Sequence, residues 1–288
     1  MVLSTNAPAQ KLSTLSETVR VLANRDGDTV AVAAIDLASG DMLLLSADLQ
    51  FHAASTMKVP VLIEVARRVD AGEFTWDDSI LVRNEFASIV DGSPYRLDPA
   101  DDSDSTVYLL IDHRTTIRHL AERMIERSSN LATNLLMALV GPARVNQTAH
   151  RLGADSIAVL RGVEDQKAYD RGMSNTTTAR DLATLLRAIE EGQAASPAGT
   201  REILRILSAQ EFNDRIPAGL PPGTRVAHKT GEITRIAHDA AIIYPPGRPP
   251  IILVILTRGY ENPEQSAKVM SDIARVIYGA IVQNPPGN

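Results

Sequence analysis

The chain has 288 residues, of which 44% are hydrophobic and 22% charged, and its formal net charge is −6. That length and apolar content suffice for one large core or for two packed lobes. Acidic and basic residues are interspersed, which argues against nucleic acid as a partner. Cysteine is absent, which excludes a thiol nucleophile, disulfides and cysteine-bound metals.

Features that the sequence lacks indicate which cofactors, membrane segments and cellular locations to expect. The six histidines show no metal-ligand spacing, so we expect no metal and no other cofactor. No apolar run has the length of a membrane span. Residues 1–6 lack the features of a signal peptide, so we expect the protein to be cytoplasmic, or periplasmic or secreted if a signal peptide has been removed. We also expect a monomer.

The predicted elements begin with a helix and a hairpin. Residues 9–24 place leucine and valine at helical spacing, and a polar turn follows at 25–28. Residues 29–36 and 42–46 are apolar, extended runs separated by an Ala-Ser-Gly-Asp turn, which predicts two antiparallel strands.

The middle of the chain is predicted to be helical, and its end to return to strands. Segment 91–105 is so rich in Asp, Ser and Pro that we expect an exposed loop there. The periodicity predicts helices at 61–69, 116–126, 131–140, 142–152, 177–191, 197–208 and 263–282, and strands at 225–229, 238–244 and 251–257.

The order of these elements predicts an α/β (α+β) fold. Strands from both ends of the chain would share one mainly antiparallel sheet, flanked by the N- and C-terminal helices. Residues 1–60 and 205–288 would form this lobe, residues 61–204 an inserted helical lobe, and the active site would lie between them.

Ser55-Thr56-Met57-Lys58 lies where the strands give way to an apolar helix. A serine and a lysine three residues apart on one helix face can act as nucleophile and base if the lysine is held neutral. The helix start also offers backbone N–H groups to an oxyanion. The alternative is that Ser55 is only an N-cap and Lys58 a solvated first-turn residue. Lysine is rare in this chain, with five residues in all, so each lysine is informative: Lys11, Lys58, Lys167, Lys229 and Lys268.

Two further short motifs complete the set. Ser128-Ser129-Asn130 begins a helical stretch and offers a hydroxyl for proton relay and an amide for a substrate carbonyl, although a plain helix cap is the alternative. Lys229-Thr230-Gly231 is expected to close a strand, where Lys supplies a cation, Thr a hydroxyl and Gly room for a ligand. Its alternative is a strand-ending turn.

In this order and in these contexts, the three motifs resemble the signature of serine β-lactamases and penicillin-binding proteins. The resemblance is to class A β-lactamases and covers nearly the whole chain. It implies that Ser55 is the acyl-forming nucleophile, Lys58 its base or relay, Ser128 a proton shuttle and Asn130 a substrate ligand. It also implies that Lys229 and Thr230 anchor the substrate carboxylate, that Gly231 lets the substrate approach closely, and that the N–H groups of Ser55 and Glu232 form the oxyanion hole.

The departures from the family concern the residue that activates water. Glu164 follows Ser128 at about the family's spacing, in segment 161–175, which we call the Ω loop. The residue four positions on is Ala168 where the family has asparagine, and the loop is a little shorter. The alternative for Glu164 is a salt bridge to Arg161 or another arginine. Ser129 stands where class A enzymes usually have aspartate.

Two residues on or near the strand after Lys229 have weaker signals. Arg235 could contact a substrate carboxylate, although a solvated strand arginine is the commoner situation. His238 is expected to be packed rather than catalytic.

These residues predict a serine β-lactamase that hydrolyses the β-lactam amide through an acyl-enzyme on Ser55. A DD-peptidase or esterase that acts on acyl-D-Ala or small esters and releases penicillins slowly is the first alternative. A non-catalytic penicillin-sensing module is the second, and the intact pair of Lys58 and Lys229 weighs against it. In each case the partner is a small molecule.

Overall fold

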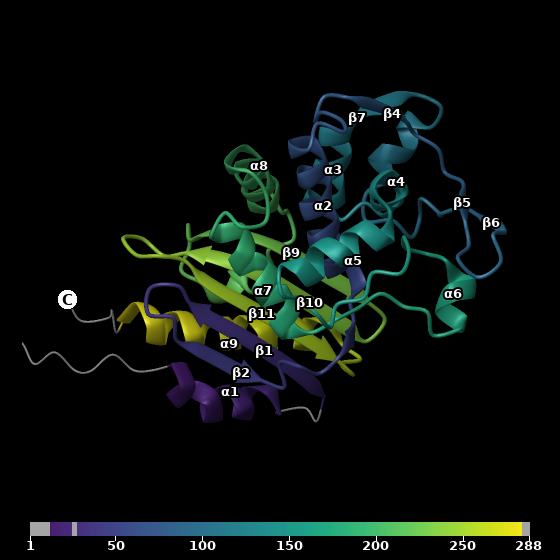
Figure 1. Cartoon of the computed structure of the whole chain (residues 1–288). Helices are drawn as coiled ribbons and strands as arrows, with labels where there is room; N and C mark the ends of the chain where they lie inside the picture. The colour runs from purple at the N-terminus through teal and green to yellow at the C-terminus, as the bar shows by residue number, and fades with distance from the viewer. Residues whose placement is uncertain (1–11, 25–27, 284–288) are drawn as a thin grey trace, which may run out of the picture.

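A five-stranded antiparallel sheet forms the centre of the computed structural model, which describes residues 12–24 and 28–283. The strand order is β2–β1–β11–β10–β9, so strands from both ends of the chain share one sheet, as predicted (Figure 1). Thr29 lies opposite Arg258 and Asp36 opposite Ile251. The strands are β1 (Thr29–Asp36), β2 (Met42–Leu45), β9 (Arg225–Ile233), β10 (Ile236–Tyr244) and β11 (Ile251–Arg258).

The two faces of the sheet are covered by different helices. Alternate residues of β1 face opposite sides of the sheet. Val30 and Val32 pack with α1 (Ser16–Ala23) and α9 (Pro263–Gln283), whereas Ala31 and Ala33 belong to a second, larger hydrophobic cluster on the other face (Figure 1). A 3-10 helix, η1 (Leu12–Leu15), leads into α1. The first terminal helix is thus confirmed where it is described; residues 9–11 and the turn residues 25–27 lie outside the described residues.

The inserted segment contains the remaining long helices. Each predicted helix is present, with ends within three residues of those predicted. They are α2 (Lys58–Asp70), α3 (Ile117–Glu126), α4 (Asn130–Val140), α5 (Pro142–Arg151), α7 (Ala179–Glu190) and α8 (Pro197–Ser208). Since α8 packs against both α2 and β9, the lobe boundaries at residues 60 and 205 stay predictions. None of the helices in the described parts of the chain has the length and apolar content needed to cross a membrane.

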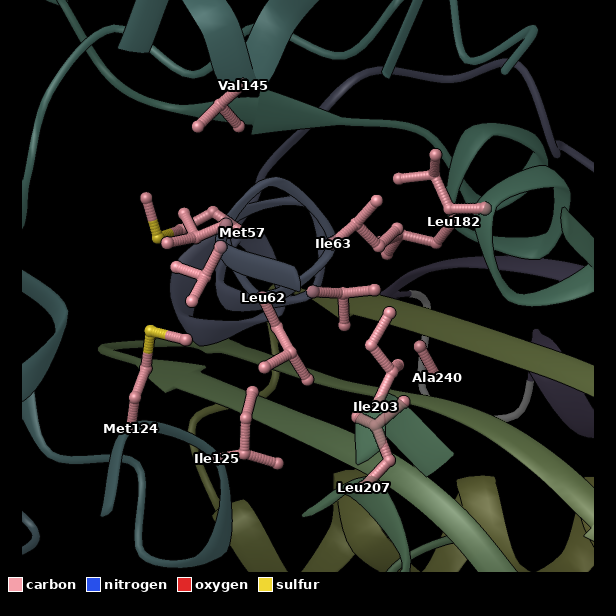
Figure 2. Packing of buried hydrophobic residues seen from close by; sticks show 14 of the residues in the cluster. Met57, Leu62, Ile63, Met124, Ile125, Val145, Leu182, Ile203, Leu207 and Ala240 are labelled. Atoms are coloured by element: carbon pink, nitrogen blue, oxygen red, sulfur yellow. The ribbon is translucent and has the colours of Figure 1, made fainter. Parts of the chain in front are cut away.

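Helix α2 is the buried centre of this segment. Its residues from Lys58 to Ala66 are all buried, so side chains on every side of the helix meet protein. Figure 2 shows Leu62 pointing toward Ile125 of α3 and Ile63 toward Leu182 of α7. The first turn of α2 is therefore fixed by packing on several elements.

The described chain also contains small elements, most of them in the insert, that the sequence did not reveal. Three two-stranded ladders pair β3 (Phe51–His52) with β8 (Thr176–Thr177), β4 (Ser79–Leu81) with β7 (Arg114–Thr116) and β5 (Phe86–Ala87) with β6 (Pro94–Tyr95). Strands of two or three residues are too short for an alternating pattern. The short helices α6 (Gln166–Asp170), η2 (Ala54–Met57), η3 (Ser105–Leu110) and η4 (Pro217–Gly219) were missed for the same reason.

The prediction that 91–105 is an exposed loop is wrong for part of this segment. Leu97 and Asp104 are buried, and Asp102 is half-buried. Asp104 accepts a hydrogen bond from the backbone of Thr106 and pairs with Arg123 at 2.6 Å. Aspartates can be buried where backbone N–H groups or a guanidinium compensate their charge, which composition alone does not show.

We expect Leu62→Ala to lower the free energy of unfolding by about 2–5 kcal/mol, because it leaves a cavity beside a helix that is buried on all sides. Urea denaturation would measure the change. Leu109→Ala is the control, since Leu109 is 81% exposed and its truncation should cost less than about 0.5 kcal/mol. Equal effects of the two substitutions would contradict the packing described for α2.

Candidate active site

Ser55 lies in η2, one turn before α2 begins at Lys58. No side chain caps the start of either helix, so the interpretation of Ser55 as an N-cap is wrong. Ala54 has φ 46°, in the left-handed region that residues with a Cβ rarely adopt. The chain thus turns sharply from β3 into η2, and Ser55 lines a cavity instead of closing a helix end.

Lys58 is completely buried, so the alternative of a solvated first-turn lysine is also wrong. Its Nζ donates to Ser128 O (2.6 Å), to Ser128 Oγ (3.0 Å) and to Asn130 Oδ1 (2.9 Å). Burial lowers the pKa of Lys58 to about 7, although the charges of Asp102 and Glu164 act in the opposite direction. Near neutral pH the amine is therefore available as a base.

The three residues of the second motif, Ser128, Ser129 and Asn130, make different contacts. Ser129 is the N-cap of α4 and accepts a hydrogen bond from the backbone of Ala132, so the helix-cap alternative holds for the middle residue alone. Ser128 adopts φ 60°, which turns its hydroxyl toward Lys58. Asn130 contacts Lys58 through Oδ1 and Glu164 through Nδ2 (2.6 Å).

The third motif lies within β9 and does not close it, which corrects the predicted strand end. β9 continues to Ile233 because β10 pairs with it, with His238 opposite Gly231. A Cβ on Gly231 would lie 3.1 Å from the backbone nitrogens of Ser55 and Thr56. Glycine is needed here for close contact between β9 and the turn that carries Ser55.

Lys229 is buried as deeply as Lys58. Its Nζ donates to the carbonyl of Thr230 at 2.9 Å. Burial, together with the positive charges of Lys58 and Arg215, lowers the pKa of Lys229 well below its ordinary value. An anionic group placed beside Lys229 would oppose this shift and favour the ammonium form.

Glu164 faces Lys58 and Asn130 from the Ω loop, with φ 63°. Burial raises the pKa of Glu164, the hydrogen bond from Asn130 lowers it, and the negative charge of Asp102 raises it. Glu164 forms no ion pair with an arginine among the described residues, because the guanidinium of Arg161 donates to the carbonyls of Met173 and Gly162. The salt-bridge alternative for Glu164 is therefore wrong.

Two asparagines that the sequence did not single out hold the Ω loop. Asn134 accepts from Val163 N (2.6 Å) and donates to Val163 O (3.0 Å), next to Glu164. Asn175 binds the backbone of Arg161 at the base of the loop, through both its oxygen and its nitrogen. Asn134 lies four residues after Asn130, so helical spacing could have placed both on one face. Ala168 is buried in α6 and contributes no polar group.

Arg235 lies in the turn between β9 and β10, with φ 60°, and so near the strand that carries Lys229. Its Nε donates to the carbonyl of Gly259, and the residue lines the larger cavity. His238 is packed, as predicted: burial lowers its pKa to about 4, and its Nε2 lies 2.8 Å from the carbonyl oxygen of His52.

Arg215, which no sequence pattern singles out, is buried on this side of the site. It donates to the carbonyls of Gly231 (2.9 Å) and His238 (2.8 Å) and pairs with the Glu232 carboxylate. The guanidinium therefore joins β9 to β10 behind the third motif.

Two cavities meet at Ser55. The larger, of about 900 Å³, is lined by Ser55, Ser128, Thr230, Gly231 and Arg235 among others. The smaller, of about 340 Å³, is lined by Ser55, Asn130 and Glu164. Ser55 is thus open on one side to a space next to the third motif and on the other to a space next to Glu164.

Comparison with known families agrees with this geometry. The sequence model described as the β-lactamase enzyme family matches residues 14–281. The chain belongs to this family. A β-lactamase from Bacteroides uniformis is 27% identical over 292 aligned residues, which cover 97% of this chain and 95% of the relative. A β-lactamase from Streptomyces albus G is 28% identical and covers 89% of this chain and 81% of the relative.

Solved structures of β-lactamase family relatives share the whole fold. The structure of PBP-A superposes with a TM-score of 0.82 and 27% identity, covering 97% of this chain and all of PBP-A. A β-lactamase from Sphaerobacter thermophilus gives a TM-score of 0.81 with 28% identity, covering 95% and 99%. An acyl-enzyme complex of a PBP-A mutant with penicillin G matches with a TM-score of 0.80, 27% identity and coverage of 96% and 99%. The mixed α/β fold and the assignment to serine hydrolases of the class A type are thus confirmed.

We expect Lys229→Ala to lower kcat/KM for a carboxylate-bearing β-lactam by at least about a hundredfold, because a charge-assisted contact in a buried site is lost. Steady-state kinetics with benzylpenicillin would measure this. Lys268→Ala is the control: it removes a lysine that pairs with Asp272 on the exposed side of α9. Unchanged kinetics of Lys229→Ala would remove this lysine from the site.

Proposed function

We propose that this protein is a serine β-lactamase that hydrolyses the β-lactam amide in two steps, acylation and deacylation of Ser55. The observation that carries the proposal is Lys58, a buried lysine whose pKa is lowered to about 7 and whose Nζ is bound to Ser128 and Asn130. Family membership and β-lactamase relatives along almost the whole chain support it. All the residues involved belong to one chain, and we propose that a monomer is active.

In the acylation step, neutral Lys58 accepts the proton of the Ser55 hydroxyl, and Ser55 Oγ attacks the β-lactam carbonyl carbon. The N–H groups of Ser55 and Glu232 stabilise the oxyanion that forms. Ser128, which accepts a hydrogen bond from Lys58, passes a proton to the β-lactam nitrogen as the C–N bond breaks. The product is an ester of Ser55 with the opened ring.

The substrate is held in the larger cavity. Lys229, Thr230 and Gly231 anchor its carboxylate, and Asn130 donates to the carbonyl of its acylamino side chain. Arg235, on the rim of the same cavity, stays a predicted contact for the carboxylate. Lys229 gains charge as the anion approaches, so binding and protonation of this lysine are coupled.

In the deacylation step, Glu164 removes a proton from a water molecule that attacks the ester carbonyl from the smaller cavity. The ester C–O bond then breaks, and Ser55 Oγ takes up the proton as it leaves, which restores the free serine and releases the opened ring as an acid. The position of Glu164 beside Ser55 and Asn130 favours hydrolysis over the DD-peptidase or esterase alternative, in which release is slow. The buried pair of Lys58 and Lys229 argues against a non-catalytic module, because two desolvated amines are costly without a chemical use.

Incubation with a chromogenic cephalosporin separates the three candidate functions. Product beyond one equivalent supports the β-lactamase, a single stoichiometric burst supports the peptidase or esterase, and the absence of a covalent adduct supports the non-catalytic module.

Ser55→Ala should abolish covalent labelling by penicillin, because the nucleophile is gone. Since Ser55 caps neither η2 nor α2, the melting temperature should stay close to that of the wild type. Intact-protein mass spectrometry after incubation with benzylpenicillin measures the adduct. A variant that still gains the mass of the opened penicillin would show that another group is the nucleophile.

Glu164→Gln should trap the acyl-enzyme. The substitution keeps the shape and the contact with Asn130 but removes the proton acceptor, so deacylation should slow by about 10²- to 10⁴-fold while acylation changes much less. Rapid-quench mass spectrometry resolves the two steps. Glu85→Gln, at an exposed carboxylate paired with Arg96, should behave as the wild type. If Glu164→Gln turns over normally with no trapped adduct, another group activates the water.

A further inference from the structure

The first turn of α4 is held by a carboxylate from outside the motif. Asp102 accepts hydrogen bonds from Asn130 N (3.0 Å to Oδ1 and 2.9 Å to Oδ2) and from Leu131 N (3.0 Å). It also accepts from the hydroxyl of Tyr108 (3.0 Å). The N–H groups of Asn130 and Leu131 are the first two of the eleven-residue helix α4, and they have no partner within the helix itself.

Asp102 differs from the other acidic residues of its loop. Asp104 is neutralised by its ion pair with Arg123, whereas Asp102 is in no ion pair among the described residues. Asp98 is exposed, and its carboxylate accepts a hydrogen bond from the backbone of Ala100, two residues later. Asp102 is therefore the carboxylate of this loop that keeps a net charge while in direct contact with the start of α4.

This arrangement bears on the unusual second motif. Ser129 occupies the position where class A enzymes usually have aspartate, and as the cap of α4 it offers only a hydroxyl at 3.3 Å. We propose that Asp102 is a positioning residue of the active site with two linked effects: its carboxylate fixes the first turn of α4, which holds Asn130 between Lys58 and Glu164, and its negative charge acts on these two bases. The proposal rests on the proposed function, in which Lys58 and Glu164 are the two bases.

The charge of Asp102 has a second effect. Asp102 raises the pKa of Lys58 against the dominant effect of burial, and it raises the pKa of Glu164 in addition to burial. Removal of the negative charge should therefore lower the pKa of both bases. Other charged and polar groups also face the two bases. Lys58 faces Lys229 of β9 and the uncharged Ser128 and Asn130 at the start of α4. Glu164 faces Asp101 of the same loop as Asp102, and the neutral phenols of Tyr95 (β6) and Tyr108 (η3).

Asp102→Asn tests this proposal because it keeps an oxygen for the helix N–H groups and removes the charge. The pKa of Lys58 should fall by about 0.5–1 unit. It can be followed by ¹³C NMR of labelled lysine side chains, since the chain has only five lysines and Lys58→Arg identifies the signal. The acidic limb of the acylation rate of Ser55 by penicillin should move to lower pH by the same amount. Asp102→Ala should in addition lower the acylation rate about tenfold or more, because Asn130 loses its support.

Asp98→Asn, which removes the same charge from an exposed position of the same loop, should leave the Lys58 pKa and the acylation profile unchanged. If Asp102 were only a structural cap, Asp102→Asn would lower the acylation rate of Ser55 by the same factor at every pH and lower the melting temperature, and the Lys58 pKa would not change. That result would overturn the proposal. The NMR titration does not depend on catalysis. A wild type that is never acylated would refute the proposed function, whereas an acylated wild type with an unmoved Lys58 pKa in Asp102→Asn would refute this proposal alone.

Discussion

The arrangement of this active site depends on the burial of the Lys58 amine. Removing an ammonium group from water costs several kcal/mol even after the protein relaxes, so the site must either supply oxygens or leave the amine neutral. Here both happen: two oxygens of Ser128 and one of Asn130 surround Nζ, and the pKa falls to about 7. The same hydrogen bonds connect α2 to the start of α4. They therefore both hold the amine in place for chemistry and fix the packing of the two helices.

Backbone strain is concentrated around the two cavities that meet at Ser55. Six non-glycine residues of the described chain have positive φ, and four of them line or adjoin the two cavities: Ala54, Ser128, Glu164 and Arg235. Each such conformation is uncommon for a residue with a Cβ and persists only where surrounding contacts determine it. Lys58 binds Ser128, Asn134 binds the backbone beside Glu164, and β9 packs against η2. The packed helices and the sheet thus maintain local geometries that the isolated segments would not adopt.

The sequence predicted the parts of this structure that have long periodic patterns or compact motifs. The sheet, the terminal helices and the six long helices between them follow from apolar spacing, and Ser55, Lys58, Ser128 and Lys229 from short motifs. The sequence could not show that Lys229 lies in mid-strand, because strand length is set by pairing with β10. Nor could it single out Asp102 or Arg215, whose importance comes from backbone groups more than fifteen residues away in sequence. Contacts of this kind carry no local spacing and appear only in three dimensions.

The pairing of β1 with β11 has a consequence for how the protein is made. Residues 29–36 leave the ribosome early, but their partner, residues 251–258, is synthesised more than two hundred residues later. Until then β1 has only β2 as a neighbour and exposes an apolar edge that could pair with another chain. The sheet, and with it the close contact of Gly231 with the turn of Ser55, can form only after nearly the whole chain has emerged. An acylatable serine should therefore appear only after residues 251–258 have been synthesised.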